Sequence, residues 1–365
     1  MRLLAIDIGG FTQDILILDT SEKIENCFKM VLPSPTVILA KKINAATSAK
    51  RPIMLTGVNM GGGYSSKALS NHLKAGLKAF ATREAATTFN DNVAEVAEMG
   101  VVILDEPERP SLSNLEVLET KDIDLLNLNK LMISFGIEPE LDGIAVAVFD
   151  HGAAPPEVSD RIFRFQHLKQ TICNRPQLGA FAYLAEEIPP PLTRMQAVAK
   201  TSKKGVPLLV MDTPIAAAIG SLEDPRVSCH THKIIMNVGN LHTLAFHLQG
   251  DTILGVFEHH TRLLTRSKAE NLIEGLVKGT LTNDAVYQDG GHGCLVLNTG
   301  SEIPFLSVTG PQRVLMTGSN LNPYFAVPYG DMMLTGCFGL ARAFTDRFER
   351  WQGEIDNSLR SLGGN

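Results

Sequence analysis

The sequence feature that most constrains the fold is a repeated pattern of strand, glycine turn and strand. The first copy, Leu3–Asp19, has an apolar run leading to Asp7, a turn that begins with two glycines, and a second apolar run. The second copy, Ile235–Leu248, has the same form around Gly239. Each copy predicts two antiparallel strands joined by a tight turn. Because an internal repeat fixes the architecture, the two copies predict similar half-domains that face each other across a cleft.

The first turn carries residue types that suit a bound polyanion. Gly9 and Gly10 lack a Cβ, so a phosphate can approach their backbone N–H groups, and Thr12 adds a hydroxyl donor. Asp7, at the end of its strand, is placed to hold a hydrated Mg²⁺ ion. An ordinary hairpin with a glycine turn is the alternative for either copy alone. The positions of Asp7, Gly9 and Thr12 are matched in the second copy by Asn237, Gly239 and His242.

Bulk composition predicts a globular chain and excludes several functions. With 365 residues, of which 44% are hydrophobic and 20% charged, we expect two folded domains. The net charge of −6 and the lack of a basic run argue against nucleic acid as a partner. No apolar run is long enough to span a bilayer, and the first residues read as a strand rather than a signal peptide, so no membrane partner is expected.

Cysteine usage points to a cytoplasmic protein without an iron–sulfur cluster. The five cysteines are scattered and no two have C-x-x-C spacing, so neither a zinc ribbon nor a cluster has support in the sequence. An odd, dispersed set of cysteines fits a reducing compartment. The expected location is therefore the cytoplasm.

Two further strands end in carboxylates that are candidates for chemistry. The apolar run Gly143–Phe149 predicts a strand buried on both faces, and Asp150 and His151 follow it. Open α/β sheets place their sites at this end of a strand, so Asp150 or His151 could orient a water or deprotonate a hydroxyl. The alternative is a capping Asp beside a turn glycine. Asp212 ends the next buried strand and precedes a helix that starts near Pro214, so it is a helix cap, a ligand of a metal-bound water, or both.

Two glycine loops are weaker candidates. Gly57–Lys67 resembles a phosphate loop in composition but lacks the G-x-x-x-x-G-K-[ST] order. It is either a flexible loop over the cleft or a substrate loop in which Lys67 reaches a phosphate. Val314–Pro323 predicts a strand entering a Gly-Ser turn, and such a turn can pass beneath a nucleoside without a side chain in the way.

Histidine spacing gives no clear metal site. His259 and His260 are adjacent, and neither a strand face nor a helix face places such a pair for chelation. His230 and His232 could share a strand face, but no third ligand accompanies them. The segment Asp289–Gly293 is expected to be a hairpin turn.

Periodicity and capping residues predict the remaining elements. Further strands are expected over residues 24–31 and 101–104, and helices over 36–49, 84–99, 266–278 and 331–351. The last of these helices is rich in small residues in its first half, which predicts close packing against another helix. Residues 69–131 fit no repeat and are expected to form an insertion.

Five segments, taken in order, resemble motifs of the actin-like ATPase superfamily, which includes actin, the seventy-kilodalton heat-shock chaperones and sugar kinases. Asp7–Asp14 has the D-x-G-G-x-T-x-D form of its first phosphate motif, and Asn237–Thr243 is similar to its second. Asp212–Gly220 and Gly330–Leu340 resemble the two connecting helices. Thr317–Asn320 resembles the adenosine motif. The first segment is fairly specific, and the other four gain weight from their order.

This resemblance implies an α/β fold of two ribonuclease-H-like domains that face a nucleotide cleft. The first domain would use residues 1–205 and 330–365, with the insertion at about 69–131, and the second would use 206–329. ATP and Mg²⁺ are the implied ligands, with Asp7 and Asp212 at the metal. The expected nucleotide contacts are Gly9, Gly10, Phe11, Thr12, Lys67, Asn237, Gly239, Asn240, His242, Thr317, Gly318, Ser319 and Asn320.

Two positions depart from the superfamily pattern. Asn237 stands where an aspartate is usual, so that metal contact would lose its charge, and Asn240 replaces a common glycine. Either ATP turnover is slow or the metal is arranged differently. His242 could act as a compensating donor.

The whole chain also resembles a prokaryotic family, common in archaea, that is sometimes labelled as pyruvate formate-lyase-activating enzyme. That activase is a radical enzyme whose cluster needs a C-x-x-x-C-x-x-C trio, and this sequence has none. Three functions therefore compete: an ATPase that acts on a protein partner, a small-molecule kinase with Asp150 as base, and a nucleotide-binding scaffold. The ATPase is favoured because no sugar-binding cluster of polar and aromatic residues is apparent.

Overall fold

Two sheets of the same layout form the body of the protein. The computed structural model describes residues 1–105 and 114–359. One six-stranded sheet has the order β3-β2-β1-β8-β10-β9 and the other β14-β13-β12-β11-β15-β16. In each, a meander of three antiparallel strands is followed by two strands that run parallel to its first strand. The internal repeat and the predicted fold class of two ribonuclease-H-like domains are confirmed.

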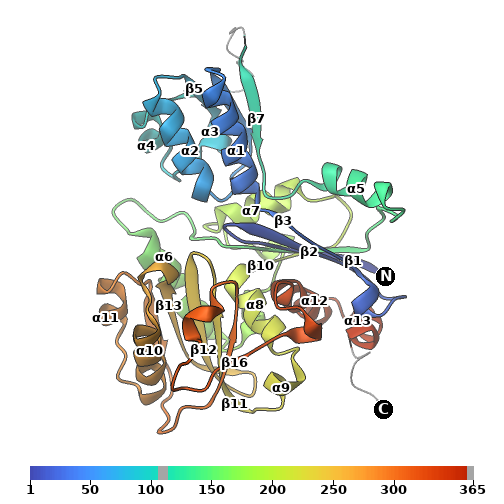
Figure 1. The fold of residues 1–365 in the computed structure, drawn as a ribbon, viewed down its shortest axis with the longest axis vertical. Helices are drawn as coiled ribbons and strands as arrows, with labels where there is room; N and C mark the ends of the chain where they lie inside the picture. The colour runs from blue at the N-terminus through green and yellow to red at the C-terminus, as the bar shows by residue number, and fades with distance from the viewer. Residues whose placement is uncertain (106–113, 360–365) are drawn as a thin grey trace.

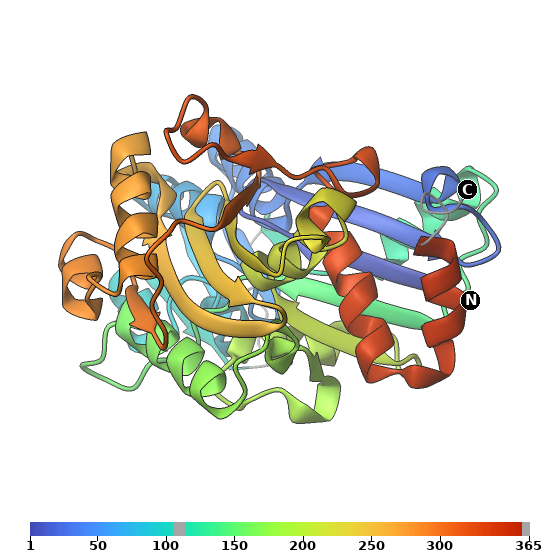
Figure 2. The ribbon, with the colours of Figure 1, turned by 90° about the horizontal axis from the view of Figure 1, so that it is seen from below.

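The first sheet is covered by helices on both faces. Its strands are β1 (Arg2–Ile8), β2 (Thr12–Asp19), β3 (Phe28–Pro33), β8 (Gly143–Val148), β9 (Tyr183–Leu184) and β10 (Leu208–Asp212). Strand β8 is buried along its whole length, as its continuous apolar sequence predicts. One face packs on α5 (Leu125–Ser134) and α7 (Thr193–Thr201), and the other on α8 (Thr213–Ser221) and α12 (Thr335–Arg347). Figure 2 shows α12 in red lying along the blue and green strands of this sheet.

The second sheet carries its own helices. Its strands are β11 (His232–Val238), β12 (His242–Gln249), β13 (Thr252–His260), β14 (Gly293–Val296), β15 (Phe305–Thr309) and β16 (Tyr324–Phe325). Helix α10 (Arg266–Lys278) packs on one face with α11 (Asn283–Gln288) beside it, and α10 has the bounds that its periodicity predicts. Near this sheet lie α6 (Asp160–Asn174) and the short α9 (Pro225–Ser228).

Helices α8 and α12 pack backbone to backbone because both contain glycine at the crossing. A Cβ added to Gly220 would lie 1.7 Å from the carbonyl oxygen of Thr335. A Cβ added to Gly339 would lie 1.8 Å from the carbonyl oxygen of Ala216. The close packing predicted from the small residues of the last helix is confirmed, and it brings the helices that connect the two sheets together.

A third, four-stranded sheet stands apart from the body at the top of Figure 1. Its parallel strands, in the order β6-β5-β4-β7, are β4 (Ile53–Gly57), β5 (Ala79–Thr82), β6 (Val101–Leu104) and β7 (Glu116–Thr120). Its helices are α1 (Pro35–Ser48), α2 (Gly63–Lys74), α3 (Arg83–Ala86) and α4 (Val93–Glu98). This subdomain starts well before the insertion expected at about 69–131, and α5 packs on the first sheet instead. The domain boundaries themselves stay a prediction.

Several expected elements differ in the structure, in part because short 3-10 turns take their place. The strand expected over 24–31 is shortened by η1 (Ile24–Asn26), the helix over 84–99 is two short helices, and the strand expected at 314–316 is η5 (Arg313–Met316). The segment 289–293 joins α11 to β14 and is not a hairpin. The other short elements are η2 (Leu178–Phe181), η3 (Ala185–Glu187), η4 (Thr261–Leu263), η6 (Pro328–Gly330), η7 (Glu349–Trp351) and α13 (Gln352–Leu359).

Helix α12 begins later than its small-residue pattern suggested. The carboxylate of Asp331 accepts hydrogen bonds from the backbone N–H groups of Met333 and Leu334, which forms a turn before the helix.

Among the described residues, no helix has both the length and the apolar character needed to cross a bilayer.

Candidate functional site

The two glycine turns face each other across one cavity. In the first turn the Gly9 N–H donates to the carbonyl oxygen of Thr12 at 2.8 Å, and in the second the Gly239 N–H donates to that of His242 at 3.0 Å. A Cβ added to Gly10 would lie 2.7 Å from Cδ1 of Leu241, so the turns also touch. A cavity of about 220 Å³ lies between them.

Most residues predicted from the two turns line this cavity. They are Asp7, Gly9, Gly10, Thr12, Asn237, Gly239, Asn240 and His242, and His151, predicted from the end of another strand, lines the cavity with them. Helices α8 and α12 supply further walls through Thr213, Ala217, Thr335 and Gly336, and the subdomain supplies Thr36 and Gly61–Gly63. The cavity therefore joins all three parts of the fold.

Other predicted residues lie outside the lining. The ring of Phe11 is 39% exposed and packs edge-on against Tyr64, with 4.8 Å between ring centroids. Lys67 is exposed on α2 and is not among the residues that line the cavity.

The predicted adenosine turn, Thr317–Asn320, lies against α10 rather than at the cavity. Arg266 donates to the carbonyl oxygen of Thr317 at 2.8 Å, and Glu270 accepts from the N–H of Asn320 at 3.1 Å. This loop follows the 3-10 helix η5 and does not line the cavity. The residues at the end of β15 line it instead.

The carboxyl end of β15 supplies the turn that sequence reasoning missed. Thr309, Gly310 and Pro311 line the cavity, and Gly310 has a φ of +100°, which favours glycine. A Cβ there would lie 2.5 Å from Oδ1 of Asn237. The sequence signal was an apolar run that ends at a glycine, and the segment that ends at Gly318 has the same pattern.

Two buried carboxylates form the floor of the cavity. Asp7 on β1 pairs with Asp14 on β2, and both line the cavity. Among the described residues, Oδ1 of each carboxylate has no hydrogen-bond partner. Burial raises the pKa of Asp14 to about 7 and that of Asp7 well above its ordinary value, and the neighbouring Asp14 adds to the rise at Asp7. Unpartnered carboxylate oxygens in this position suit a divalent cation with oxygen ligands.

Asp212, the second predicted metal ligand, is instead held in an ion pair. Nη1 and Nη2 of Arg164 donate to its two carboxylate oxygens at 2.7 and 3.0 Å, and Nε of Arg164 donates to Glu258 at 2.8 Å. All three side chains are buried. Because Arg164 engages both oxygens of Asp212, the geometry favours Asp14 as the partner of Asp7 at a metal.

Asp150 lines a second cavity of about 890 Å³ rather than the first. Its oxygens accept from the backbone N–H groups of Gly152 at 2.8 Å and Met195 at 2.9 Å, and burial raises its pKa to about 6. His151 lines both cavities, so the second cavity continues the first towards the subdomain.

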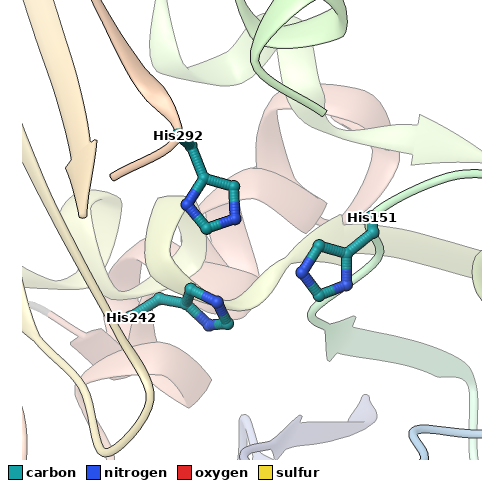
Figure 3. A group of neighbouring side chains, drawn as sticks. All are labelled: His151, His242 and His292. Atoms are coloured by element: carbon teal, nitrogen blue, oxygen red, sulfur yellow. The ribbon is translucent and has the colours of Figure 1, made fainter. Parts of the chain in front are cut away.

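His292 is a further site residue that sequence reasoning missed, since its segment was interpreted only as a turn. It lies with His151 and His242 in one group, in which one ring nitrogen from each histidine lies within 4.8 Å of the other two (Figure 3). Burial lowers the pKa of His151 to about 3 and lowers the pKa values of His242 and His292 as well, which favours the neutral form of each imidazole.

A protein-family model matches residues 60–315, which is more than half of the chain. The model is described as "Putative pyruvate format-lyase activating enzyme (DUF1786)". The chain belongs to this family. The second resemblance in the sequence is thereby confirmed, while the activity in the family's description is not tested by the match. No curated protein matched the sequence.

Solved structures are only remotely similar. The ethanolamine utilization protein EutJ from Carboxydothermus hydrogenoformans has a TM-score of 0.33 and 11% identity, over 93% of this chain and 89% of that one. The Aquifex aeolicus Ppx/GppA phosphatase has a TM-score of 0.25 and 11% identity, over 98% and 89%.

A ROK family transcriptional regulator, a homolog of the E. coli MLC protein, has a TM-score of 0.27 and 7% identity over 69% of this chain. This chain spans only 38% of that regulator's length. The fold assignment rests on the repeated strand order and not on these likenesses.

Proposed function

We propose that this protein binds ATP with Mg²⁺ between its two ribonuclease-H-like domains, and that it is a slow, cytoplasmic ATPase that acts on a protein partner. The observation that carries the proposal is the pair of equivalent glycine turns that touch across one cavity. A single glycine turn is common, whereas two related turns aimed at the same space indicate a ligand with phosphates.

The turns supply backbone donors for phosphate. Gly9 and Gly239 use their N–H groups to close the turns. In the part of the chain that the structure describes, no protein hydrogen bond engages the N–H groups of Gly10 or Asn240, which come next. These two groups belong to opposite turns, so a bound phosphate chain would be held from both domains.

Asp7 and Asp14 fit a hydrated Mg²⁺. Mg²⁺ in nucleotide sites is held by one or two carboxylates, by phosphate oxygens and by several waters. The unpartnered oxygens of the two carboxylates would become ligands of the ion when it binds, and this contact offsets the free-energy cost of burying them. When bound, the ion would neutralise charge on the phosphates.

Slow turnover follows from Asn237. Its amide lies at the turn of Gly310 and can donate or accept a hydrogen bond, but it supplies no negative charge to a metal-bound water. Removing one electrostatic contact of this kind typically costs about 10²–10³ in rate. We therefore expect nucleotide binding to survive while unstimulated hydrolysis is slow.

Cleft opening is part of the proposal. The cavity of about 220 Å³ is smaller than the range of about 300–1,000 Å³ that is usual for ligand pockets. A whole nucleotide would therefore enter only if the domains part, and their hinge motion would couple nucleotide state to shape. Such a shape change is what a protein partner could recognise.

A small-molecule kinase is the second candidate, and the second cavity favours it. That cavity adjoins the first, and Asp150 and His151 line it, so a substrate hydroxyl could sit near the phosphates. A radical activase is disfavoured because the five cysteines lie in separate segments of the sequence, each a free thiol in the part of the chain that the structure describes.

A phosphate-release assay tests the proposed activity. The parent protein should release phosphate slowly and with Mg²⁺, Asn237→Asp should be faster, and Asp7→Ala should abolish release in both backgrounds. A fast parent enzyme that is slowed by Asn237→Asp would show that catalysis is built around the amide, and the proposal of a slow ATPase would then be wrong. Phosphate transfer to a small molecule with no release to water would favour the kinase.

A further inference from the structure

Three histidines from both domains converge at the edge of the cavity. His151 follows β8 of the first sheet, whereas His242 begins β12 and His292 precedes β14 of the second sheet. Their closest ring nitrogens all lie within 4.8 Å of one another. Ring centroids are 5.1 Å apart for His242 and His292, and 5.6 Å apart for His151 and His242. Figure 3 shows the three rings pointing into a common space.

Three buried ring nitrogens of this group have no hydrogen-bond partner among the described residues. His292 is 1% exposed, and within residues 1–105 and 114–359 neither of its ring nitrogens has a hydrogen-bond partner. Nε2 of His242 is likewise buried without a partner among those residues. Buried polar atoms are ordinarily paired, and an unpaired one costs stability unless a ligand, ion or water satisfies it.

The loop that carries His292 is fixed from several sides. Gly290 has a φ of +92°, and a Cβ on Gly291 would lie 2.7 Å from Cδ2 of His259. Arg161 donates to the carbonyl oxygen of Gly291 at 2.7 Å, and the N–H of His292 donates to that of Glu258 at 2.9 Å. These contacts hold the loop, and with it the ring of His292, in a defined position.

The other two rings are also held in place. The ring of Phe149 stacks on His242 at 4.0 Å between centroids with 8° between planes, and the guanidinium carbon of Arg164 lies over the Phe149 ring, 3.7 Å from its centroid. Asp150 accepts two backbone hydrogen bonds and thereby fixes the turn that carries His151. The charge of Arg164 is balanced by its two carboxylate partners.

We propose that His151, His242 and His292 bind a divalent transition-metal ion of the zinc class and so join the two domains. Three imidazoles without a carboxylate select Zn²⁺ or a similar first-row ion over Mg²⁺. Nitrogens bound at 2.0–2.1 Å to a tetrahedral ion are about 3.3 Å apart, so the rings would approach one another slightly on binding. His151 and His242 line the cavity, and the fourth ligand position would therefore open towards it.

This site is separate from the Mg²⁺ expected at Asp7 and Asp14. It uses nitrogen ligands at the cavity wall and requires no nucleotide. Failure of nucleotide binding would leave the metal proposal standing, and failure of the metal proposal would leave the nucleotide site standing.

Cobalt(II) titration of the nucleotide-free protein, purified without a histidine tag, tests the proposal. Co²⁺ serves as a visible probe for a site of the zinc class. One equivalent should give saturable visible absorption bands that Zn²⁺ removes, and Zn²⁺ should raise the melting temperature of the parent protein. Both effects should be lost in His292→Gln and, as a second variant, in His151→Gln, with folding checked by circular dichroism.

His232→Gln is the matched control. Nε2 of His232 lies 2.6 Å from Nε2 of His247, so this variant breaks up a close pair of histidines away from the proposed ligands, which stay intact. The Co²⁺ bands should be unchanged in it. No saturable bands in the parent, bands that persist in both His292→Gln and His151→Gln, or bands lost only in His232→Gln would each overturn the proposal.

Discussion

Replacing Asp14 by asparagine should stabilise the metal-free protein at neutral pH. The Asp14 carboxylate is 8% exposed, faces Asp7, and has one oxygen without a partner among the described residues. Burial raises its pKa from 3.8 to about 7. The folded protein therefore carries an unfavourable charge above pH 7, which the amide of nearly identical shape would remove.

The size of the effect follows from that pKa. A pKa raised from 3.8 to about 7 corresponds to on the order of 4 kcal/mol between the two protonation states. The amide brings its own polar atoms into the site, at a cost of about 1–3 kcal/mol. The expected net gain in the free energy of unfolding is therefore about 1–3 kcal/mol at pH 8.

The gain should depend on pH in a defined direction. The folded state keeps the Asp14 proton up to about pH 7, whereas the unfolded chain releases it near pH 4. Between these values the folded state binds more protons, so the stability of the parent falls as pH rises. The asparagine variant lacks this loss, and its advantage should grow from pH 4 to 7 and then level off.

Urea unfolding in EDTA at several pH values measures this advantage. Asp19→Asn is the matched control on the same strand. Burial opposes ionisation of Asp19, but hydrogen bonds from Ser21 and Arg2 outweigh it and lower its pKa to about 2, so the control should lose stability at neutral pH. If Asp14→Asn is less stable than the parent at pH 8, or its advantage is the same at pH 4 and pH 8, the reasoning is refuted.

Three further predictions concern packing, a buried ion pair and catalysis. Gly339→Ala should destabilise the protein by about 1–3 kcal/mol or more in urea unfolding, because its Cβ meets backbone, while Gly179→Ala, with open space around it, should change little. Arg164→Met should lower the free energy of unfolding by about 3–5 kcal/mol, because two buried carboxylates lose their partner. Arg51→Met breaks an exposed ion pair and should lower it by under about 1 kcal/mol. Asn237→Asp should raise unstimulated phosphate release by up to about 10²-fold. A neutral Gly339→Ala, an equal loss for the two arginine variants, or no change for Asn237→Asp would contradict the respective argument.

The repeat was predictable because each copy is a local pattern. An apolar strand, a carboxylate or amide near its end, and a glycine turn are all encoded within about a dozen residues. Asp7 and Asn237 could therefore be assigned to one cleft from the sequence. The glycines of the last helix predicted its close packing against another helix for the same reason, since they too form a local pattern.

The parts that were missed depend on contacts between distant residues. The pairing of Asp212 with Arg164 joins residues that are 48 positions apart, and nothing near Asp212 in the sequence signals it. His292 meets its neighbours only because α11 and β14 place its loop beside two other segments. Asp14 could have been found, since a residue opposite Asp7 in a hairpin must share its face.

The turn predicted to contact adenosine shares its composition with the turn that lines the cavity. Both Thr309–Pro311 and Thr317–Asn320 follow apolar residues and contain a glycine, but only the first ends a strand that pairs with β11. Strand pairing is set by the whole sheet, so the sequence pattern alone could not choose between them.

Calorimetric titration of ATP into the protein, with Mg²⁺ and with EDTA, tests the central claim most directly. The parent should bind one ATP, and more tightly with Mg²⁺. Asp7→Ala should lose the gain from Mg²⁺ while keeping metal-free binding, and Asp19→Asn should behave as the parent. No saturable binding by the parent in either condition, or an equal loss in both conditions for Asp7→Ala, would contradict a Mg²⁺–nucleotide site between the two turns.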